Sequence, residues 1–372
     1  MIQARQHPFI YATRSIIPSG SANAIQSANM ACAFSNLFES FSTVFRSPCR
    51  LEDLPAVFAG FELPPPRNPH LIAVRPATDW SNLYLTGYAA WLRRQPATSV
   101  VYTRSGKVGW VAASLGFKTI VELHDPLIIP YALWLRRRRR LEPGLKVVAT
   151  TERLKADVIE KTGLSAAGIL VAGGAANPAL LTVPALEPQR RFAFNAGYAG
   201  SAFKGKGLEI LAACASRMPD VGFHVIGPSG EDCRPYGLAG ANVLVYGRKT
   251  NREAIGLLKS MDCLLLPNQR SVIIRSGADI GRHTSPLKMF EYMATGRPVI
   301  ASDLPVLSGT LQNNVNALLC PPEDVDGFCA HISALRQNPD LGRRLGARAR
   351  VDFEARYTWP VRAKAIHDFI YS

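Results

Sequence analysis

Residues 285–300 read Ser-Pro-Leu-Lys-Met-Phe-Glu-Tyr-Met-Ala-Thr-Gly-Arg-Pro-Val-Ile, a stretch that contains the signals of a short helix followed by a buried strand. Ser285 is a favourable N-cap, Pro286 suits the first helical position, and Gly296 suits the helix end. The apolar run that starts at Pro298 predicts a strand. A helix that alternates with strands is the repeating unit of a parallel α/β sheet, so this stretch predicts a doubly wound fold.

The same alternation extends along the rest of the chain. Short β-branched or aromatic runs predict strands in the N-terminal half at 9–12, 42–45, 71–74, 99–103, 119–123, 146–150 and 168–172. In the C-terminal half they predict strands at 192–198, 222–226, 242–246, 263–266, 298–301 and 317–319. Helices are predicted there at 208–218, 252–261, 286–295 and 327–338. We therefore expect two Rossmann-like domains in tandem.

The length of 372 residues supports two domains, because one hydrophobic core rarely organises more than about 250–300 residues. A proline-rich stretch at 178–190 separates the two runs of strands and is typical of a linker. The predicted domains are therefore 1–183 and 184–356. A final segment, 357–372, is helical in pattern, and we expect it to pack back on the N-terminal domain.

Composition places the chain among globular proteins, with 47% hydrophobic and 19% charged residues. No apolar run approaches the roughly 18 residues of a membrane-spanning helix, and no secretory signal pattern begins the chain, so we expect a cytoplasmic protein. The seven cysteines are scattered and never in Cys-x-x-Cys spacing, which suggests neither disulfides nor a zinc site. The net charge of +15 predicts an anionic partner: nucleic acid, anionic lipid or a phosphorylated substrate. A basic surface without a dedicated partner is the simpler alternative.

The helix that follows Ser285 offers a phosphate site. Its first N–H groups have no intrahelical acceptor, its dipole end is positive, and Lys288 adds a full charge in the first turn. Glu291 follows about one turn later and is placed to bind a ribose diol beyond the phosphate. On chemistry alone a simpler interpretation stays open, in which Ser285 only caps the helix and Glu291 lies on a solvated face.

A second phosphate element is the glycine-rich turn at 197–207, Gly-Tyr-Ala-Gly-Ser-Ala-Phe-Lys-Gly-Lys-Gly, directly after the first strand of the second domain. Glycines allow a backbone to approach an anion closely, and Lys204 and Lys206 supply charge. The turn matches neither the P-loop nor the dinucleotide-binding fingerprint. Alone, such a loop is a weak signal.

These motifs give the second half a resemblance to the C-terminal domain of family 4 glycosyltransferases. The resemblance is carried by the turn at 197–207, the strand Asp-Cys-Leu-Leu-Leu-Pro at 262–267, the stretch 285–300, and Tyr-Thr-Trp at 357–359. It implies the GT-B fold, two Rossmann-like domains facing each other across a cleft, a nucleotide-sugar donor and retention of anomeric configuration. The donor diphosphate would then be bound by Gly20, Ser201, Lys204, Lys206, Ser285, Pro286, Leu287 and Lys288. The ribose would be bound by Glu291, and the donor sugar by His283 and Thr284.

Two departures from the family pattern concern the donor. Ser201 stands where many members have an arginine, and His283 stands where many have a glutamate eight residues before Glu291. The residues expected to bind most of the phosphate and the ribose are thus retained, while the residues expected to recognise the sugar depart from the family pattern. Neither the sugar nor the nucleotide base is predicted beyond UDP or GDP.

The N-terminal domain resembles the family through Ile-Pro-Ser-Gly-Ser-Ala-Asn at 17–23 and Thr-Ile-Val-Glu-Leu-His-Asp at 119–125. His124 falls at the carboxyl end of a predicted strand, where open α/β sheets bind ligands. The resemblance implies that His124 contacts the donor sugar near the reacting carbon, so we expect His124 and Lys206 to be the catalytic residues. The alternatives are a histidine satisfied by neighbouring backbone and, around Gly20, a simple turn.

No metal or other cofactor is expected, because no Asp-x-Asp follows a strand and the histidines are not spaced as ligand pairs. Lys206, Lys288 and helix N–H groups would stabilise the leaving diphosphate instead. The sequence offers no obvious nucleophile, so front-side attack without a covalent intermediate is our hypothesis. A sugar-nucleotide epimerase or hydrolase of the same shape, or a non-catalytic binding protein, are the alternatives.

An apolar, aromatic segment at 128–135 runs directly into five arginines. This combination favours an anionic membrane surface and a lipid-linked or polysaccharide acceptor in bacterial surface glycan assembly. The predicted membrane contacts are Trp134, Arg136, Arg137, Arg138, Arg139 and Arg140. A core helix followed by a solvated basic turn is the alternative, while no motif supports binding of nucleic acid. The oligomeric state is not predicted.

Overall fold

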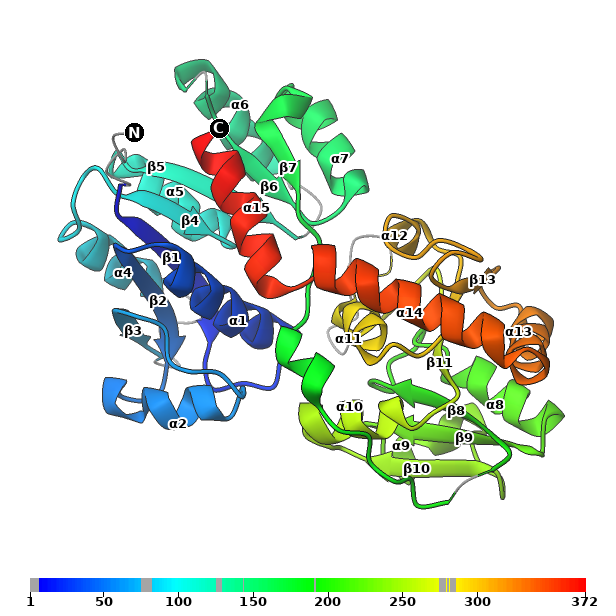
Figure 1. Ribbon diagram of the computed structural model, residues 1–372. Coiled ribbons are helices and arrows are strands. Elements are labelled where there is room, and N and C mark those ends of the chain that lie inside the picture. Colours follow the sequence, from blue (N-terminus) through cyan, green and yellow to red (C-terminus); the bar gives the residue numbers. More distant parts are fainter. Residues whose placement is uncertain are drawn as a thin grey trace. The chain divides into compact units, whose positions relative to one another are not determined.

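The computed structural model describes residues 7–74, 82–124, 129–142, 144–190, 192–273, 279, 281 and 286–372. The chain divides into two compact units, each with its own parallel sheet (Figure 1). Unit 1 comprises Met1–Gly173 and Trp359–Ser372, and unit 2 comprises Gly174–Thr358. The alternation of strands and helices in the sequence thus corresponds to two α/β domains.

Unit 1 has a seven-stranded sheet in the order β3-β2-β1-β4-β5-β6-β7. Its strands are β1 (Phe9–Ile16), β2 (Phe41–Ser47), β3 (Pro69–Ala73), β4 (Val100–Thr103), β5 (Lys118–Leu123), β6 (Val147–Ala149) and β7 (Ile169–Val171). Its described helices are α1 (Ala22–Leu37), α2 (Leu54–Ala59), α4 (Tyr84–Leu92), α5 (Gly106–Ser114), α6 (Ile129–Leu141), α7 (Glu152–Thr162) and α15 (Trp359–Tyr371), with 3-10 turns η1 (Leu51–Asp53) and η2 (Ala166–Gly168). Every strand predicted for this half is present.

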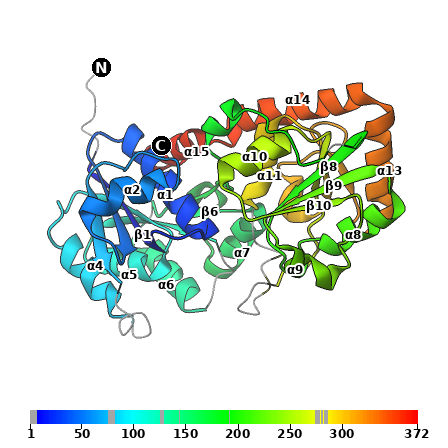
Figure 2. The same ribbon diagram turned by 90° about the horizontal axis from the view of Figure 1, so that it is seen from below.

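Both faces of this sheet are covered, because side chains of β1 alternate between two cores. Phe9 and Tyr11 contact the ring of Phe34 on α1. Ile10 and Ala12 join a core with α4 and α5 on the opposite face. Figure 2 shows α1 and α15 on one side of the sheet and α4 and α5 on the other.

Unit 2 has a six-stranded sheet in the order β10-β9-β8-β11-β12-β13. Its strands are β8 (Phe194–Ala199), β9 (Val221–Ile226), β10 (Val243–Gly247), β11 (Cys263–Leu266), β12 (Val299–Ser302) and β13 (Leu318–Cys320). Its described helices are α8 (Leu208–Arg217), α9 (Gly230–Cys233), α10 (Asn251–Lys259), α11 (Leu287–Thr295), α12 (Pro305–Ser308), α13 (Val325–Gln337) and α14 (Pro339–Arg356), with turns η3 (Pro178–Thr182) and η4 (Arg234–Tyr236). Strand β11 again alternates: Leu264 and Leu266 pack with α10 and α11, whereas Cys263 and Leu265 pack with α8 and α13.

The boundary between the units lies at Gly173, ten residues before the predicted boundary at 183. Pro178, the first proline of the stretch that suggested a linker, instead begins η3, which packs on α11. Lys259 of α10 donates hydrogen bonds to the carbonyl groups of Leu181 (2.9 Å) and Val183 (2.7 Å), and Val183 is buried in the core of unit 2. These contacts tie the segment to the second sheet.

The C-terminal segment returns to unit 1. The structure ends α14 at Arg356 and starts α15 at Trp359, so that Pro360 occupies the first turn, where its missing N–H costs no hydrogen bond. Helix α15 packs lengthwise on α1 (Figures 1 and 2). Within the described ranges, no helix combines the length and the apolar character that crossing a bilayer requires.

Each sheet reverses its strand order once, between β1 and β4 in unit 1 and between β8 and β11 in unit 2. In open parallel sheets, ligands bind outside the carboxyl ends of strands at such a switch point. The topology therefore directs attention to the loops that follow these four strands.

Candidate functional site

The loop after β8 is packed too closely for side chains. A Cβ atom on Gly200 would clash with the Lys288 amine, and one on Gly207 would clash with the Pro267 carbonyl. Gly205 and Gly207 also have positive φ angles, 86° and 82°, which favour glycine. The glycine-rich turn seen in the sequence is thus required by the close approach of neighbouring backbone and of Lys288.

Two lysines meet at this switch point. Lys206 follows β8, and Lys288 extends from the first turn of α11 so that its Nζ atom lies 4.9 Å from the centre of the Tyr198 ring. Burial, together with the positive charge of Lys206, lowers the pKa of Lys288 to about 7, although Glu291 opposes the shift. Burial also lowers the pKa of Lys206. Two partly desolvated cations at a helix N-terminus are suited to a phosphate or diphosphate.

The start of α11 differs by one residue from the prediction. The structure has Pro286 as N-cap, with extended backbone, and Leu287 as the first helical residue, whereas the sequence pattern predicted Ser285 and Pro286 in these roles. Assignments of helix ends commonly differ by a residue. The predicted sugar-reading residues His283 and Thr284, and Ser285 itself, lie outside the described residues.

Glu291 is held by a side chain that the sequence pattern did not reveal. Asn251 Nδ2, at the start of α10, donates a hydrogen bond of 2.8 Å to Glu291 Oε1. Burial raises the pKa of Glu291, against the hydrogen bond from Asn251 and the charge of Lys288. The carboxylate is therefore oriented and half-buried rather than simply solvated, and it retains acceptor capacity for a diol.

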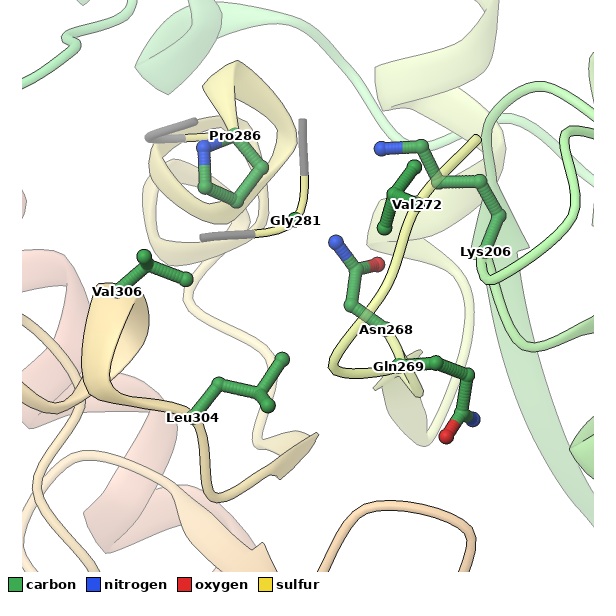
Figure 3. A pocket seen from close by; sticks show the side chains of 8 residues that line it. All are labelled: Lys206, Asn268, Gln269, Val272, Gly281, Pro286, Leu304 and Val306. Atoms are coloured by element: carbon green, nitrogen blue, oxygen red, sulfur yellow. The ribbon is translucent and has the colours of Figure 1, made fainter. Parts of the chain in front are cut away.

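Figure 3 shows a pocket beside these groups. It is lined by Lys206, Asn268, Gln269, Val272, Gly281, Pro286, Leu304 and Val306. Asn268 and Gln269 follow β11 and are only 8% and 5% exposed. The amide of Asn268 extends between Lys206 and Pro286, and the backbone N–H of Gln269 donates to the Gly205 carbonyl (2.8 Å). No motif in the sequence had selected this pair of amides.

The other predicted diphosphate residues contribute less to this cluster. Lys204 is exposed, and its carbonyl accepts a hydrogen bond from Ile273 N (3.1 Å). The Ser201 carbonyl accepts from the Tyr198 hydroxyl (3.0 Å). Gly20 of unit 1 is exposed, and a Cβ atom there would meet nothing within 4 Å. Packing alone does not require glycine at that position.

In unit 1, His124 follows β5 and its ring is engaged by two charged side chains. The Nε2 atom lies 2.6 Å from Glu122 Oε1 and 2.8 Å from Arg104 Nε, while Nδ1 lies 3.3 Å from Arg104 Nη2. Burial and the charge of Arg104 lower the pKa of His124, against Glu122. The His124 ring is thus contacted by side chains. The alternative interpretation, a histidine satisfied by neighbouring backbone, expected backbone partners instead.

The arginine run belongs to α6 itself, so it is neither a solvated turn nor a separate segment. Ala132 and Leu135 bury the inner face of this helix, and Trp134 is partly buried in the same core. Arg138 donates to the Thr119 carbonyl (3.1 Å). Trp134 and Arg138 therefore lie on the side of α6 that packs on unit 1.

Across the described ranges, no group of three or more His, Cys, Asp or Glu side chains is placed to hold a metal ion. All seven cysteines are free thiols. The groups gathered at the two switch points are therefore lysines, arginines, amides, one histidine and two glutamates.

Comparison with known proteins agrees with this geometry. Residues 193–338, inside unit 2, match the family model described as "Glycosyl transferases group 1". The phosphatidyl-myo-inositol mannosyltransferase of Mycolicibacterium smegmatis is 25% identical over 162 residues, which make up 42% of this chain and only 39% of that protein.

Solved structures match along nearly the whole chain. A glycosyltransferase from Rickettsia africae ESF-5 has a TM-score of 0.72 at 13% identity, with 98% of each chain covered. HepE from Anabaena, in complex with UDP and glucose, has a TM-score of 0.69 at 15% identity, covering 99% of this chain and 100% of that one.

The fold is therefore GT-B: two Rossmann-like units, with a C-terminal helix that returns to the first. The match of residues 193–338 to the group 1 glycosyltransferase model agrees with the family resemblance carried by the motifs at 197–207, 262–267 and 285–300.

Proposed function

We propose that the protein is a glycosyltransferase that moves a sugar from UDP or GDP to a hydroxyl acceptor. The observation that carries this proposal is the grouping of Lys206, Lys288 and the start of α11, with Glu291 one turn along the same helix. The two lysines provide charge for a diphosphate, and the carboxylate is placed for the ribose. The match to group 1 glycosyltransferases and the UDP bound in the related HepE structure support the assignment.

The chemistry follows from where charge develops. As the sugar leaves, negative charge grows on the diphosphate, and preorganised cations stabilise that charge in the transition state. Lys288, whose pKa is near 7 without a ligand, gains a proton when a diphosphate binds beside it. Lys206 and Lys288 thereby take the role that a divalent metal ion has in other transferases, and we propose that the reaction needs no metal.

Retention of anomeric configuration by front-side attack is the finer part of the proposal. His124 of unit 1 is our candidate for the contact with the donor sugar, and Lys206 for stabilising the leaving group. Activity should survive EDTA, and product stereochemistry by NMR should be that of the donor. Inverted product, or activity abolished by EDTA and restored by a divalent metal ion, would overturn this part.

Two other functions are separated by simple assays. A hydrolase or epimerase would convert the nucleotide sugar without an acceptor, whereas a transferase would need one. A binding protein would bind UDP or GDP in calorimetry and show no turnover with any acceptor. Matched variants Lys206→Ala and Lys204→Ala refine the test, because both remove a lysine from one loop but only Lys206 lines the pocket.

We also propose that α6 places the enzyme on an anionic membrane surface at the cytoplasmic face, with a lipid-linked or polysaccharide acceptor in bacterial surface glycan assembly. Leu133 (57% exposed) and Leu141 (74% exposed) share one face of α6 with the exposed Arg136, Arg137 and Arg140, at spacings of three and four residues. This face combines apolar side chains with three cations, as helices at membrane interfaces do. It adds two leucines to the predicted contacts and corrects two of them, because Trp134 and Arg138 pack on unit 1 instead.

The membrane proposal is tested by co-sedimentation with vesicles of neutral or anionic lipid. Replacing Arg136, Arg137 and Arg140 by glutamine should abolish binding to anionic vesicles, since each contributes about 1 kcal/mol near such a surface. The control replaces Arg343, Arg344 and Arg348 of α14 in the same way. Equal binding by wild type and the α6 variant would refute the membrane role and leave the transferase proposal intact.

A further inference from the structure

A charge cluster lies fully inside unit 1 at the end of β5. The Glu122 side chain is 0% exposed, and its Oε1 atom lies 3.0 Å from Arg362 Nη2 and 3.5 Å from Arg104 Nε. The Tyr102 hydroxyl donates a hydrogen bond to its other oxygen. Through the same Oε1, Glu122 contacts His124 at 2.6 Å. One buried carboxylate therefore joins four cationic or titratable side chains, from β4, α15 and the segments that follow β4 and β5.

Such a carboxylate is costly to bury unless it is fully paired. Burial alone would raise the pKa of Glu122, but Arg362, His124 and Arg104 hold it well below its usual range. Glu122 thus stays ionised inside the domain. Replacing a buried ion pair by apolar residues is often neutral for stability, so its presence beside a ligand-binding edge calls for a role other than stability.

Arg362 fixes this carboxylate from the C-terminal helix. It lies in the first turn of α15 and is 4% exposed. Its Nε atom donates to the Gly173 carbonyl (2.6 Å) and its Nη2 atom to the Ala172 carbonyl (3.0 Å). Arg362, in the segment that returns to unit 1 at Trp359, therefore binds the last residues of unit 1 before the chain leaves it.

On the other side of the histidine, hydrogen bonds to α1 hold Arg104 in place. Its guanidinium donates to Gln26 Oε1 (2.9 Å) and Ser27 Oγ (3.0 Å) of α1. Together, Arg104 and Glu122 contact both ring nitrogens of His124. The imidazole is therefore held by two side chains that are themselves immobilised.

We propose that Glu122, clamped by Arg362 of the C-terminal helix, is the positioning residue that sets the orientation of the His124 ring at the ligand-binding edge of unit 1. The Glu122 carboxylate and Arg104 Nε both contact Nε2, and Arg104 Nη2 faces Nδ1. Helix α15 then contributes to the active site without touching a substrate. The inference rests on the proposed function, because it assigns His124 to the transferase site.

The first test measures the pKa of the His124 ring by NMR and does not require enzymatic activity. The groups that face His124 are Glu122 on β5, Arg104 after β4 and Arg362 on α15, with buried Tyr11 and Tyr102 beyond them. Glu122→Gln removes the one negative charge and should lower the pKa of His124 in an NMR titration. An unchanged His124 titration in Glu122→Gln would overturn the inference.

The second test is kinetic. Arg362→Met and Glu122→Gln should each lower kcat by about 10- to 100-fold, the effect of a misplaced group near the reacting atoms, while the affinity for UDP or GDP, bound by unit 2, stays near wild type. Arg362→Lys keeps the charge and should restore most of kcat. Leu154→Ala, which opens a cavity in the core of unit 1 away from the cluster, serves as the stability control.

The outcomes distinguish the two proposals. Wild-type kcat in Arg362→Met, or a loss no larger than that of Leu154→Ala at equal melting temperature, would refute positioning by Arg362. A wild-type protein that binds neither UDP nor GDP, and turns over no nucleotide sugar, would instead refute the proposed function. The NMR titration would still report whether Glu122 controls the ring.

Discussion

Unit 1 and unit 2 both bury charge at a switch point, but they balance it differently. In unit 1, the Glu122 carboxylate neutralises part of the charge of Arg104 and Arg362, and every partner is internal. In unit 2, Lys206 and Lys288 lie together, and among the described residues neither forms an ion pair. The first cluster contains its own anion, the Glu122 carboxylate. The second has no such paired anion among the described residues, and we propose that a donor diphosphate supplies it.

The largest expected effect comes from removing a cation in the incomplete cluster. Lys206→Ala should lower kcat by about 100- to 1,000-fold, since a preorganised group at developing negative charge contributes that much in other enzymes. Steady-state kinetics with the best nucleotide sugar measure it. Lys204→Ala, an exposed lysine two residues away, should keep kcat within a few-fold. Equal losses in both variants would contradict the assignment of Lys206.

A smaller effect is expected at the ribose contact. Glu291→Gln should weaken binding of UDP or GDP by roughly tenfold or more, because a hydrogen bond to a charged group contributes about 1.5–3 kcal/mol. Asn251→Ala should weaken it less, since it removes only the side chain that orients the carboxylate. Calorimetry measures both variants. A Glu291→Gln variant with wild-type affinity would show that this carboxylate does not bind the nucleotide.

The glycine turn that supports the lysines is tested through stability. Gly207→Ala should lower the free energy of unfolding by more than Gly237→Ala does. Both positions have positive φ, 82° and 65°, with a cost of about 1–2 kcal/mol for any side chain, but only Gly207 would also clash with neighbouring backbone. Chemical denaturation measures the difference. Equal losses would show that the loop can open to accept a Cβ atom.

The smallest expected effect distinguishes a residue that contacts the sugar from one that contacts the nucleotide. Asn268→Ala should weaken binding of the nucleotide sugar a few-fold while leaving the affinity for UDP or GDP unchanged, because the Asn268 amide lines the pocket beside Lys206 and we assign it to the sugar. Parallel calorimetry with both ligands tests this. Equal weakening of both ligands would place Asn268 against the diphosphate instead.

The sequence predicted what depends on local pattern. Alternating apolar runs located the strands of both sheets, and the Pro286–Gly296 signals located α11 within one residue, because caps and periodicity act over a few residues. The family motifs selected Lys206, Lys288 and Glu291, which the structure gathers at one switch point.

Contacts between residues far apart in the sequence could not be predicted from local patterns. Arg362 and Glu122 meet only because α15 returns to unit 1, and Asn251 meets Glu291 only because α10 and α11 are neighbours. One signal was present: Glu122 is a charged residue inside an apolar predicted strand, and a buried charge requires a partner. The sequence did not show which partner.

The pKa of Lys288 gives the most direct test of the central claim that the Lys206–Lys288 cluster binds a diphosphate. With a pKa near 7, this lysine is mostly neutral at pH 8 in the free protein, and a bound diphosphate raises its pKa. Binding of UDP or GDP at pH 8, measured by calorimetry in buffers of different ionisation enthalpy, should therefore take up close to one proton. Affinity should fall as pH rises above 7, and Lys288→Met should abolish the uptake. Binding without proton uptake, or the same uptake in Lys288→Met, would contradict the account.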